Sequence, residues 1–330
     1  MASTELSRAS IKDVAREAGV STATVSRVLT GARAVREESV QAVTDAVQKL
    51  GYRPNQLGRA LRLQSTATVG MVVPRVDNPF FPAIIQRVEQ QLHDAGFEML
   101  LCTSNDDPDL ESEKVRTLLG RQVDALLISA CDAVKSGPIL QEASRRVPVV
   151  QIDQVTADWE GDFVGVDDDG GIRAIVEHLR GSGRRRLAYI GSGDENSSGA
   201  ARSRAFRALV PGAPMRLGAF NAQWGETAAI DLLDGDHPPD AIVCGNDMIA
   251  LGALRACEAR SVRVPDEVSV TGFDDVELAA VLRPALTTVR QPVQGLVDEA
   301  VRLIVERTTG VSRPGVRVTL QTELVQRQSA

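Results

Sequence analysis

From residue 67 onward, short apolar or β-branched runs alternate with stretches of helical periodicity, and this alternation constrains the fold more than any other feature. The run TVGMVVP, for example, begins at Thr68 and is followed by a helical stretch over residues 82–95. Strands and helices that alternate in this way form parallel sheets with helices on both faces. The sequence therefore predicts an α/β fold for most of the chain.

The alternation falls into two series of similar length, which predicts two similar parallel-sheet lobes. In the first series the further strands are FEMLLCT, VDALLISA and VPVVQID, with helices near residues 110–121 and 139–146. The second series restarts at GDFVGVD and continues with RRLAYIGS, MRLGAF, DAIVCGN and VSVTGFD; its helices are expected at residues 170–182, 201–209, 225–233 and 248–259. We expect LTTVRQPV to cross back, so that a helix at residues 295–309 joins the first lobe.

The N-terminal stretch SIKDVAREAGVSTATVSRVLT, residues 10–30, has a different pattern that predicts two short helices around a tight turn. Apolar residues recur at i, i+3, i+4 and i+7 on the first helix, which is the spacing of one helical face: Ile11, Val14, Ala15 and Ala18. Gly19 then provides a C-terminal stop, and Ser21 offers a side-chain oxygen to cap a second helix over residues 22–29. A third helix is expected at residues 37–50.

The second of these helices presents small or hydroxylated groups and one guanidinium on its outer face, namely Thr22, Ala23, Ser26 and Arg27. A short helix of this kind suits the DNA major groove, in the manner of a helix-turn-helix. A generic two-helix corner in a globular core is the alternative interpretation of the same spacing.

The distribution of charge separates the head from the rest of the chain. Residues 1–64 hold ten Lys and Arg against six Asp and Glu, a net charge of +4, whereas the whole chain carries −7, so the remainder carries −11. A basic head on an acidic body is expected when only the head meets phosphate, although a solvated basic face would give the same count.

Bulk properties exclude several classes of protein. No apolar run approaches the roughly 20 residues of a membrane span, and the N-terminal residues lack the apolar core of a secretory signal. The four cysteines form no CxxC pair and only three histidines are present, which argues against a zinc cluster. We expect a cytoplasmic protein with buried thiols, without cofactor or metal, and without contact to a membrane.

Four motifs resemble the LacI/GalR family of transcription regulators. They are IKDVA at residues 11–15, AGVS at 18–21, TVSRVL at 24–29 and LGYRPN at 50–55, and the resemblance continues through nearly the whole chain. It implies a small all-α helix-turn-helix domain at residues 1–50, a hinge helix or linker at 51–65, and an effector-binding and dimerisation domain at 66–330. This last domain would resemble a periplasmic binding protein, with two Rossmann-like parallel-sheet lobes, at about 66–164 with 293–320 and about 165–290 with 321–330.

The resemblance also implies which residues contact DNA. Arg27 occupies the position that reads a guanine, and residues 22 and 23 the positions that set operator choice. In the hinge, Leu61 would wedge a base step beside Arg59, with ordinary packing as the alternative for this leucine. The DNA-contacting residues expected are Ser10, Ile11, Ser21, Thr22, Ala23, Thr24, Ser26, Arg27, Thr30, Asn55, Arg59 and Leu61.

Ligands of parallel sheets bind beyond the carboxyl ends of the strands, so the residues there are the candidates for a ligand site. The set combines carboxylates, amides, an arginine and aromatic rings, which suits a polyhydroxylated ligand. Its expected effector-binding members are Asn78, Phe80, Phe81, Ser129, Asp153, Ser198, Arg202, Phe220, Asn246, Asp274 and Gln291. By resemblance Arg202, Asp153 and Asp274 match the family's effector positions, as do Phe220, Asn246 and Gln291. Asp247 and Asp275 are expected to cap helices instead.

The resulting hypothesis is a repressor of carbohydrate-utilisation genes, acting as a homodimer on a palindromic DNA operator and controlled by a small sugar-like effector. A regulator that needs a corepressor, or responds to a nucleoside, is the alternative. A solute-binding protein is disfavoured by the basic head. An enzyme is disfavoured because no GxGxxG, GxSxG or GKS/T motif is present.

Overall fold

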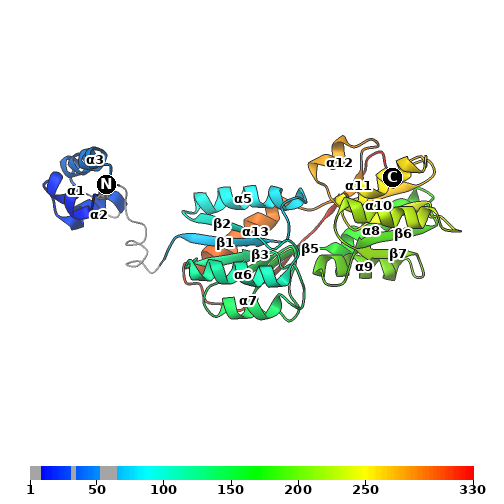
Figure 1. The fold of residues 1–330 in the computed structure, drawn as a ribbon, viewed down its shortest axis with the longest axis horizontal. Helices are drawn as coiled ribbons and strands as arrows, with labels where there is room; N and C mark the ends of the chain where they lie inside the picture. Colours follow the sequence, from blue (N-terminus) through cyan, green and yellow to red (C-terminus); the bar gives the residue numbers. More distant parts are fainter. Residues whose placement is uncertain (1–8, 31–34, 53–64) are drawn as a thin grey trace, which may run out of the picture. The chain divides into compact units, whose positions relative to one another are not determined.

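The computed structural model describes residues 9–30, 35–52 and 65–330, and the chain divides into two compact units, residues 1–66 and 67–330. Figure 1 shows the smaller, helical unit and the larger unit with its two lobes. We refer to these units as the head and the body and describe each by itself.

The head contains the three expected helices, α1 (Ile11–Glu17), α2 (Thr22–Thr30) and α3 (Glu37–Leu50). Their apolar faces meet in one small core made of Val14, Ala15, Val25, Val43 and Ala46. Gly19 stands between α1 and α2 with a left-handed φ of +67°, a conformation that glycine adopts without the steric cost of a Cβ atom. The predicted helix-turn-helix geometry is therefore present.

The first lobe of the body is built on a six-stranded sheet in the order β11-β5-β4-β3-β1-β2, in which all neighbouring strands run parallel. Its strands are β1 (Thr68–Val73), β2 (Glu98–Thr103), β3 (Ala125–Ile128), β4 (Val149–Ile152), β5 (Asp162–Val166) and β11 (Arg317–Leu320). Its helices are α5 (Phe80–Asp94), α6 (Pro108–Gly120), α7 (Gly137–Ser144) and α13 (Val293–Thr308). Two apolar clusters cover the two faces of this sheet.

The second lobe repeats this plan with the strand order β12-β10-β9-β8-β6-β7. Its strands are β6 (Leu187–Ser192), β7 (Met215–Gly218), β8 (Ala241–Cys244), β9 (Ser269–Asp274), β10 (Thr287–Arg290) and β12 (Glu323–Val325). Its helices are α8 (Asp168–Gly181), α9 (Ser197–Leu209), α10 (Ala222–Leu233), α11 (Asp247–Ala259) and α12 (Glu277–Val281). Only the edge strand β12 runs antiparallel to its neighbour among the paired strands that the structure describes.

The structure corrects the expected point at which the second series begins. Strand β5, which contains the run GDFVGVD, pairs with β4 and β11 in the first sheet rather than opening the second. The chain therefore enters the second lobe after Val166, returns between β10 and α13, and passes over once more between β11 and β12. The expected lobe boundary at residues 164 and 165 falls inside a strand, because alternation along the chain does not say which sheet a strand joins.

Helix N-termini begin earlier than the apolar periodicity indicates. Helix α9 begins at Ser197 rather than at residue 201, and α5 at Phe80 rather than at residue 82. The first turns of α9 and α11 follow asparagine caps, since Asn196 accepts a hydrogen bond from the backbone of Gly199 and Asn246 one from Ile249. Polar capping turns bring the chain onto the ligand-binding edge of the sheet without any apolar spacing.

The cysteines of the body are buried or partly buried, as the sequence predicts. Cys131, Cys244 and Cys257 are buried and Cys102 is half-buried, all as free thiols, which agrees with the expectation of buried cysteines. Among the helices in the described ranges, none is both long enough and apolar enough to cross a membrane.

Candidate ligand cleft and nucleic-acid interface

A cavity of about 400 Å³ lies between the two lobes of the body, at the carboxyl ends of the parallel strands. Pockets that hold small ligands span roughly 300–1,000 Å³, so the cavity is large enough for a metabolite. The first lobe contributes residues that follow β1, β2, β3 and β4, and the second lobe residues at or after the ends of β6, β7, β8 and β9. A ligand bound here would touch both lobes.

Arg202 is the central cation of the cavity, and α9 places it there. The residue is 2% exposed, and its Nε donates to Oδ1 of Asp168 at 2.7 Å while Nη1 donates to the Gly245 carbonyl oxygen at 2.8 Å. The guanidinium also lies 3.7 Å from the centroid of the Phe273 ring. These contacts hold the guanidinium in one orientation. Asp274 Oδ1 also lies close to it, 3.6 Å from Nη1.

Asp153 and Asp274 face this guanidinium from the two lobes. Each stands at the carboxyl end of a strand, β4 or β9, and each has a positive φ, +64° and +116°. Non-glycine residues in this region are strained and concentrate at functional sites. Burial raises the pKa of Asp153 to about 7, against the opposing effect of Arg202. Burial also raises the pKa of Asp274 to about 6, so the cleft holds carboxyl groups that are partly protonated near neutrality.

Aromatic rings supply the apolar part of the lining. Phe80 and Phe81 begin α5 and pack edge to face, with ring centroids 5.5 Å apart and an angle of 68° between the planes. Phe220 follows β7 on the second lobe and is half-buried. Rings from both lobes therefore border the same cavity as the carboxylates and Arg202.

Most residues expected at the ligand site line this cavity: Asn78, Phe80, Phe81, Asp153, Ser198, Arg202, Phe220, Asn246 and Asp274. Ser129 and Gln291 do not line it but lie behind it. Gln291 Nε2 donates to Oδ1 of Asp274 at 2.7 Å, and Ser129 Oγ lies 3.5 Å from Oδ2 of Asp153. These two residues can orient the cleft carboxylates without touching a ligand.

The expectation that Asp247 and Asp275 cap helices is wrong. Asp247 is buried and accepts hydrogen bonds from Thr288 Oγ1 at 2.5 Å and from the backbone of Val276 at 2.9 Å, while its neighbour Asn246 caps α11. Asp275 pairs with Arg290 at 2.8 Å and with Arg327 at 2.6 Å. Both carboxylates join segments that are distant in sequence, which a local capping pattern cannot predict.

Sequence reasoning missed several polar residues of the cleft. Arg75, Asp106, Gln154, Glu195 and Asn196 line the cavity, and Asp168 holds Arg202 from behind it. Asp168 lies in the run DDDG at the start of α8, where the capping role belongs to Asp167. A run of acidic residues at the start of a helix indicates capping, so the sequence gave no separate sign that Asp168 belongs to the ligand site.

The exposed face of α2 is the candidate nucleic-acid interface of the head. Ser21, Thr22, Ala23 and Arg27 are exposed, whereas Val25 on the opposite face is buried. As expected, Ser21 caps the helix, because its Oγ accepts a hydrogen bond from the backbone of Thr24 at 3.1 Å.

The other expected DNA-contacting residues are distributed around this face. Ser10 precedes α1, where its backbone N–H and its hydroxyl both donate to Asp13, and it is exposed; Ile11 is half-buried. Thr24 and Ser26 are also half-buried, and Thr30 ends α2. Asn55, Arg59 and Leu61 lie outside the described residues.

Comparison with known proteins decides the family. Residues 10–55 match the model of bacterial regulatory proteins of the lacI family, and residues 176–330 match a periplasmic binding protein-like domain. The ribose operon repressor of Escherichia coli K12 is 31% identical over 329 residues, which are 98% of this chain and all of the relative. This chain belongs to the LacI family. It is therefore a DNA-binding transcriptional repressor with an effector-binding domain, and not an enzyme.

Other relatives cover the chain equally well. The transcriptional repressor PurR of Mannheimia succiniciproducens is 31% identical over 97% of this chain and 98% of its own length. The crystal structure of the Lac repressor dimer bound to operator and the anti-inducer ONPF superposes with a TM-score of 0.89 and 25% identity, over 98% of this chain and 99% of that one. A complex of the transcriptional regulator CelR with cellobiose superposes with a TM-score of 0.74 and 31% identity, over 98% of this chain and 100% of that one. The LacI-family fold predicted for head and body is thus confirmed.

Proposed function

We propose that this LacI-family repressor controls genes of carbohydrate utilisation and that a small sugar bound in the cleft sets its affinity for an operator. The observation that carries the proposal is the cavity between the lobes, in which Arg202, Asp153 and Asp274 converge beside aromatic rings. Carboxylates and a fixed guanidinium hydrogen-bond hydroxyl groups, and rings cover the apolar face of a sugar.

The relatives support a sugar as the effector. One of them is named for the ribose operon, and one solved regulator holds cellobiose. A nucleoside is the second candidate, because Phe80, Phe81 and Phe220 offer ring faces on which a base could stack while the polar groups take its ribose.

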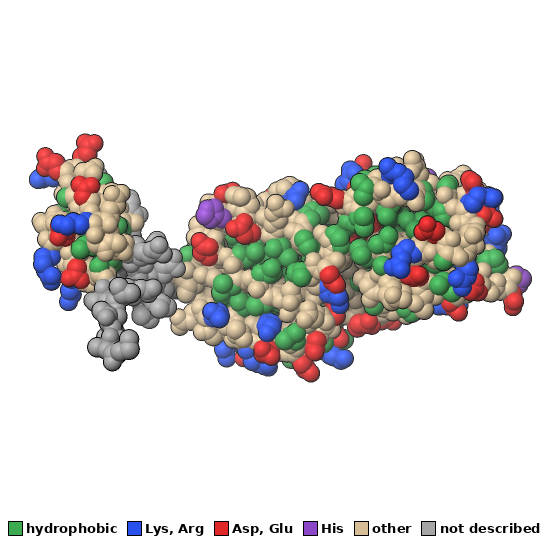
Figure 2. All heavy atoms as spheres, turned by 45° about the horizontal axis from the view of Figure 1, so that its top comes forward, with side chains coloured by type: hydrophobic (Ala, Val, Ile, Leu, Met, Phe, Trp, Pro, Cys, Tyr) green, Lys and Arg blue, Asp and Glu red, His purple; other side chains and the backbone are tan. Residues whose placement is uncertain are grey.

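On the DNA side, we propose that α2 enters the major groove and that a homodimer of this chain binds a palindromic operator. The exposed residues of α2, with Arg27 as the base-reading side chain, support the first point. Apolar exposure supports the second: Val281 at the end of α12 is 66% exposed and Leu101 of β2 is 40% exposed. Figure 2 shows hydrophobic side chains gathered on both lobes over one face of the body. Contiguous apolar surface of this kind marks protein contacts.

Ligand control follows from the position of the cavity. A ligand that contacts both lobes favours one angle between them, and a body dimer passes that angle to the segments that lead to the two heads. Coupling free energies of about 1–3 kcal/mol are typical, which corresponds to several-fold to hundred-fold control of operator affinity. We propose induction, in which the ligand releases DNA, rather than corepression.

The test uses the full-length protein. Operator DNA is first selected from a random pool, and sugars and nucleosides are then screened by thermal shift. A sugar that raises the melting temperature should also weaken the binding of the selected DNA in a gel shift. A nucleoside that does so in place of every sugar favours the second candidate, and a ligand that tightens DNA binding replaces induction by corepression. If no compound changes DNA binding, the proposal fails.

A further inference from the structure

We propose that the cleft accepts uncharged or amine-bearing ligands and excludes phosphorylated and carboxylated ones, because Asp153 and Gln154 offer open acceptors whereas each cation of the lining already has a carboxylate partner. This inference rests on the proposed function in that it takes the cleft as the effector site. It adds the charge class of the effector, which neither the fold nor the volume of the cavity decides.

Carboxylates outnumber cations in the lining of the cavity. The acidic side chains are Asp106, Asp132, Asp153, Glu195 and Asp274, and the basic ones are Arg75, Lys135 and Arg202. Five against three leaves an excess of two carboxylates, and Asp168 adds another directly behind Arg202. With every carboxyl group ionised the site carries a negative formal charge, which the raised pKa values of Asp153 and Asp274 reduce near neutral pH without reversing its sign.

Each of the three cations has a carboxylate partner within the protein. Arg75 pairs with Asp77 and lies 3.4 Å from Asp106, and Lys135 lies 3.8 Å from Asp132. Arg202 is the most deeply buried of the three: Asp168 and the Gly245 carbonyl oxygen accept two of its five N–H donors, Asp274 lies 3.6 Å from Nη1, and the Phe273 ring covers one face of the guanidinium. An anionic ligand would have to displace these partners, and Lys135, which is 74% exposed, is the cation that could turn most easily.

Two acceptors of the lining, Asp153 and Gln154, are in the opposite situation. Among the described residues, the Asp153 side chain accepts one hydrogen bond, from Ser129 at the long distance of 3.5 Å. Its neighbour Gln154 is 4% exposed and lines the cavity, and Gln154 Oε1 has no hydrogen-bond partner within the described chain. Buried polar groups without partners are rare in folded proteins, which marks this pair as available to donors on a ligand.

Hydroxyl and ammonium groups donate hydrogen bonds, whereas phosphate and carboxylate only accept them at neutral pH. A sugar hydroxyl or an amine can therefore serve Asp153 and the Gln154 amide together. The charges that face Asp153 are Asp274 from β9, Asp168 from α8 and Arg202 from α9. An ammonium placed beside Asp153 is attracted by the excess of negative charge. A phosphate or carboxylate placed there would be repelled.

The experiment measures ligands in matched sets on the full-length protein by calorimetry and thermal shift. The sets are ribose with ribose 5-phosphate; glucose with glucosamine, glucose 6-phosphate and glucuronate; and adenosine with its 5′-monophosphate. In the set that binds, we expect the neutral or amine member to bind at least about tenfold more tightly than its anionic counterpart. An anionic member that binds as tightly as its neutral counterpart overturns the inference.

Two variants and a control locate the effect. Asp153→Asn keeps the shape of the side chain and should reduce the ratio of the affinity for the neutral ligand to that for the anionic one. Gln154→Leu should weaken the binding of the neutral ligand without raising the relative affinity of the anionic one. Asp266→Asn, on an exposed aspartate outside the lining, should leave the ratio unchanged. An unchanged ratio in Asp153→Asn contradicts the assignment of the discrimination to this carboxylate.

The outcomes separate this inference from the proposed function. If adenosine is the compound that binds, and it binds more tightly than its monophosphate, the inference on ligand charge stands and the proposal of a sugar effector fails. If a sugar phosphate binds best and releases DNA, the inference on ligand charge fails and control by a carbohydrate stands. If no member of any set binds at millimolar concentration, both fail.

Discussion

Arg202 in α9 and Asp168 in α8 are joined by a hydrogen bond of 2.7 Å from Nε to Oδ1, so the cation of the cleft is held by a carboxylate outside the cavity lining. The two side chains are 3% and 13% exposed. Their pairing leaves the edge of the guanidinium that carries Nη1 near Asp274 and the Gly245 carbonyl oxygen. The geometry of the cleft thus depends on a residue outside its lining.

Arg202→Met should destabilise the protein strongly. It would leave Asp168, Asp274 and Asp153 without their shared cation, and removal of one partner of a buried ion pair costs about 3–5 kcal/mol. The free energy of unfolding in urea checks this expectation. Arg216→Met is the matched control, because its pair with Asp231 is exposed and should be worth about 1 kcal/mol or less. Equal losses in the two variants would show that the charges in the cleft are not coupled as described.

Stability should fall as the pH rises from about 4 to about 7 through the carboxyl groups of the cleft. The pKa values of Asp153 and Asp274, about 7 and about 6, lie above the ordinary value of about 3.9 in an unfolded chain. The folded protein therefore binds more protons than the unfolded one in this window, so the free energy of unfolding decreases with increasing pH.

Asp153→Asn provides the control for this pH dependence. The variant lacks one of the titrating groups, so its unfolding free energy should change less between pH 5 and pH 7 than that of the wild type. Denaturant unfolding at a series of pH values measures the difference. A slope as steep as that of the unaltered protein would mean that Asp153 does not take up the proton.

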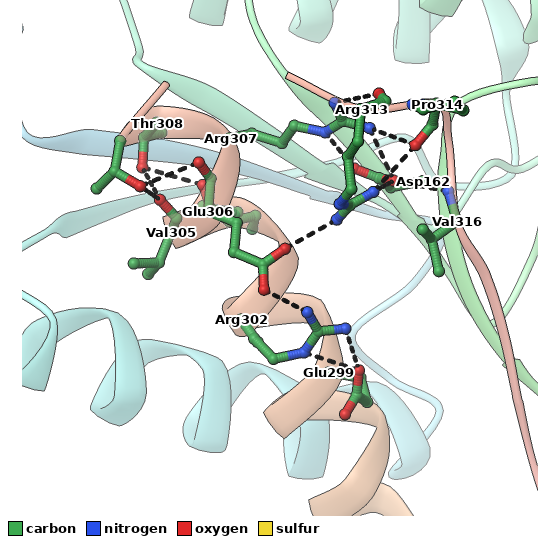
Figure 3. A network of polar contacts seen from close by, with 12 residues as sticks. Asp162, Glu299, Arg302, Val305, Glu306, Arg307, Thr308, Arg313, Pro314 and Val316 are labelled. Atoms are coloured by element: carbon green, nitrogen blue, oxygen red, sulfur yellow. Dashed lines mark hydrogen bonds and ion pairs between the residues drawn. The ribbon is translucent and has the colours of Figure 1, made fainter. Parts of the chain in front are cut away.

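Asp162 at the start of β5 is a second site where loss of one carboxylate should be costly. It is 2% exposed and accepts hydrogen bonds from Arg307 Nε and Arg313 Nη1, both at 2.7 Å, and from the backbone of Val316 at 2.9 Å. Figure 3 shows how these contacts join β5, the end of α13 and the segment before β11. Asp162→Asn should cost about 2–4 kcal/mol, somewhat less than the roughly 3–5 kcal/mol of a fully buried pair, because both arginines are partly exposed.

The pH dependence of this site has the opposite sign. Burial works against the charge on Asp162, but the hydrogen bonds from Arg307 and Arg313 outweigh it and lower the pKa of this carboxyl. Its contribution is thus present above about pH 4 and is lost in acid, and Asp162→Asn should remove that loss. Glu299→Gln, in a partly exposed pair with Arg302, serves as the control and should change stability little.

Arg27→Ala should weaken operator binding and relax its specificity. A bidentate arginine–guanine contact is worth about 1–3 kcal/mol, so we expect a loss of roughly five- to hundredfold with the selected operator. Arg16→Ala on α1 removes the same charge from an exposed side chain outside the recognition helix and should cost less. Gel shifts with the operator and with a scrambled duplex measure both. A uniform loss on the two duplexes would make Arg27 a phosphate contact instead.

The sequence alone determined the parts of this protein that rest on local patterns. The apolar spacing from Ile11 to Leu50 defined three helices, the alternation from Thr68 defined strands and helices, and strand ends indicated Asp153, Arg202 and Asp274 as cleft residues. Such patterns arise from the periods of the helix and the strand, which act over a few residues and can be read along the chain.

The tertiary structure decided which distant residues meet. It placed β5 in the first sheet, turned Asp247 and Asp275 from expected caps into partners of Thr288 and Arg327, and put Asp168 behind Arg202. Strand order, ion pairing and burial depend on contacts between segments that are far apart in sequence, and no local period encodes them. The charge environment that we propose for the effector arises from the same long-range packing.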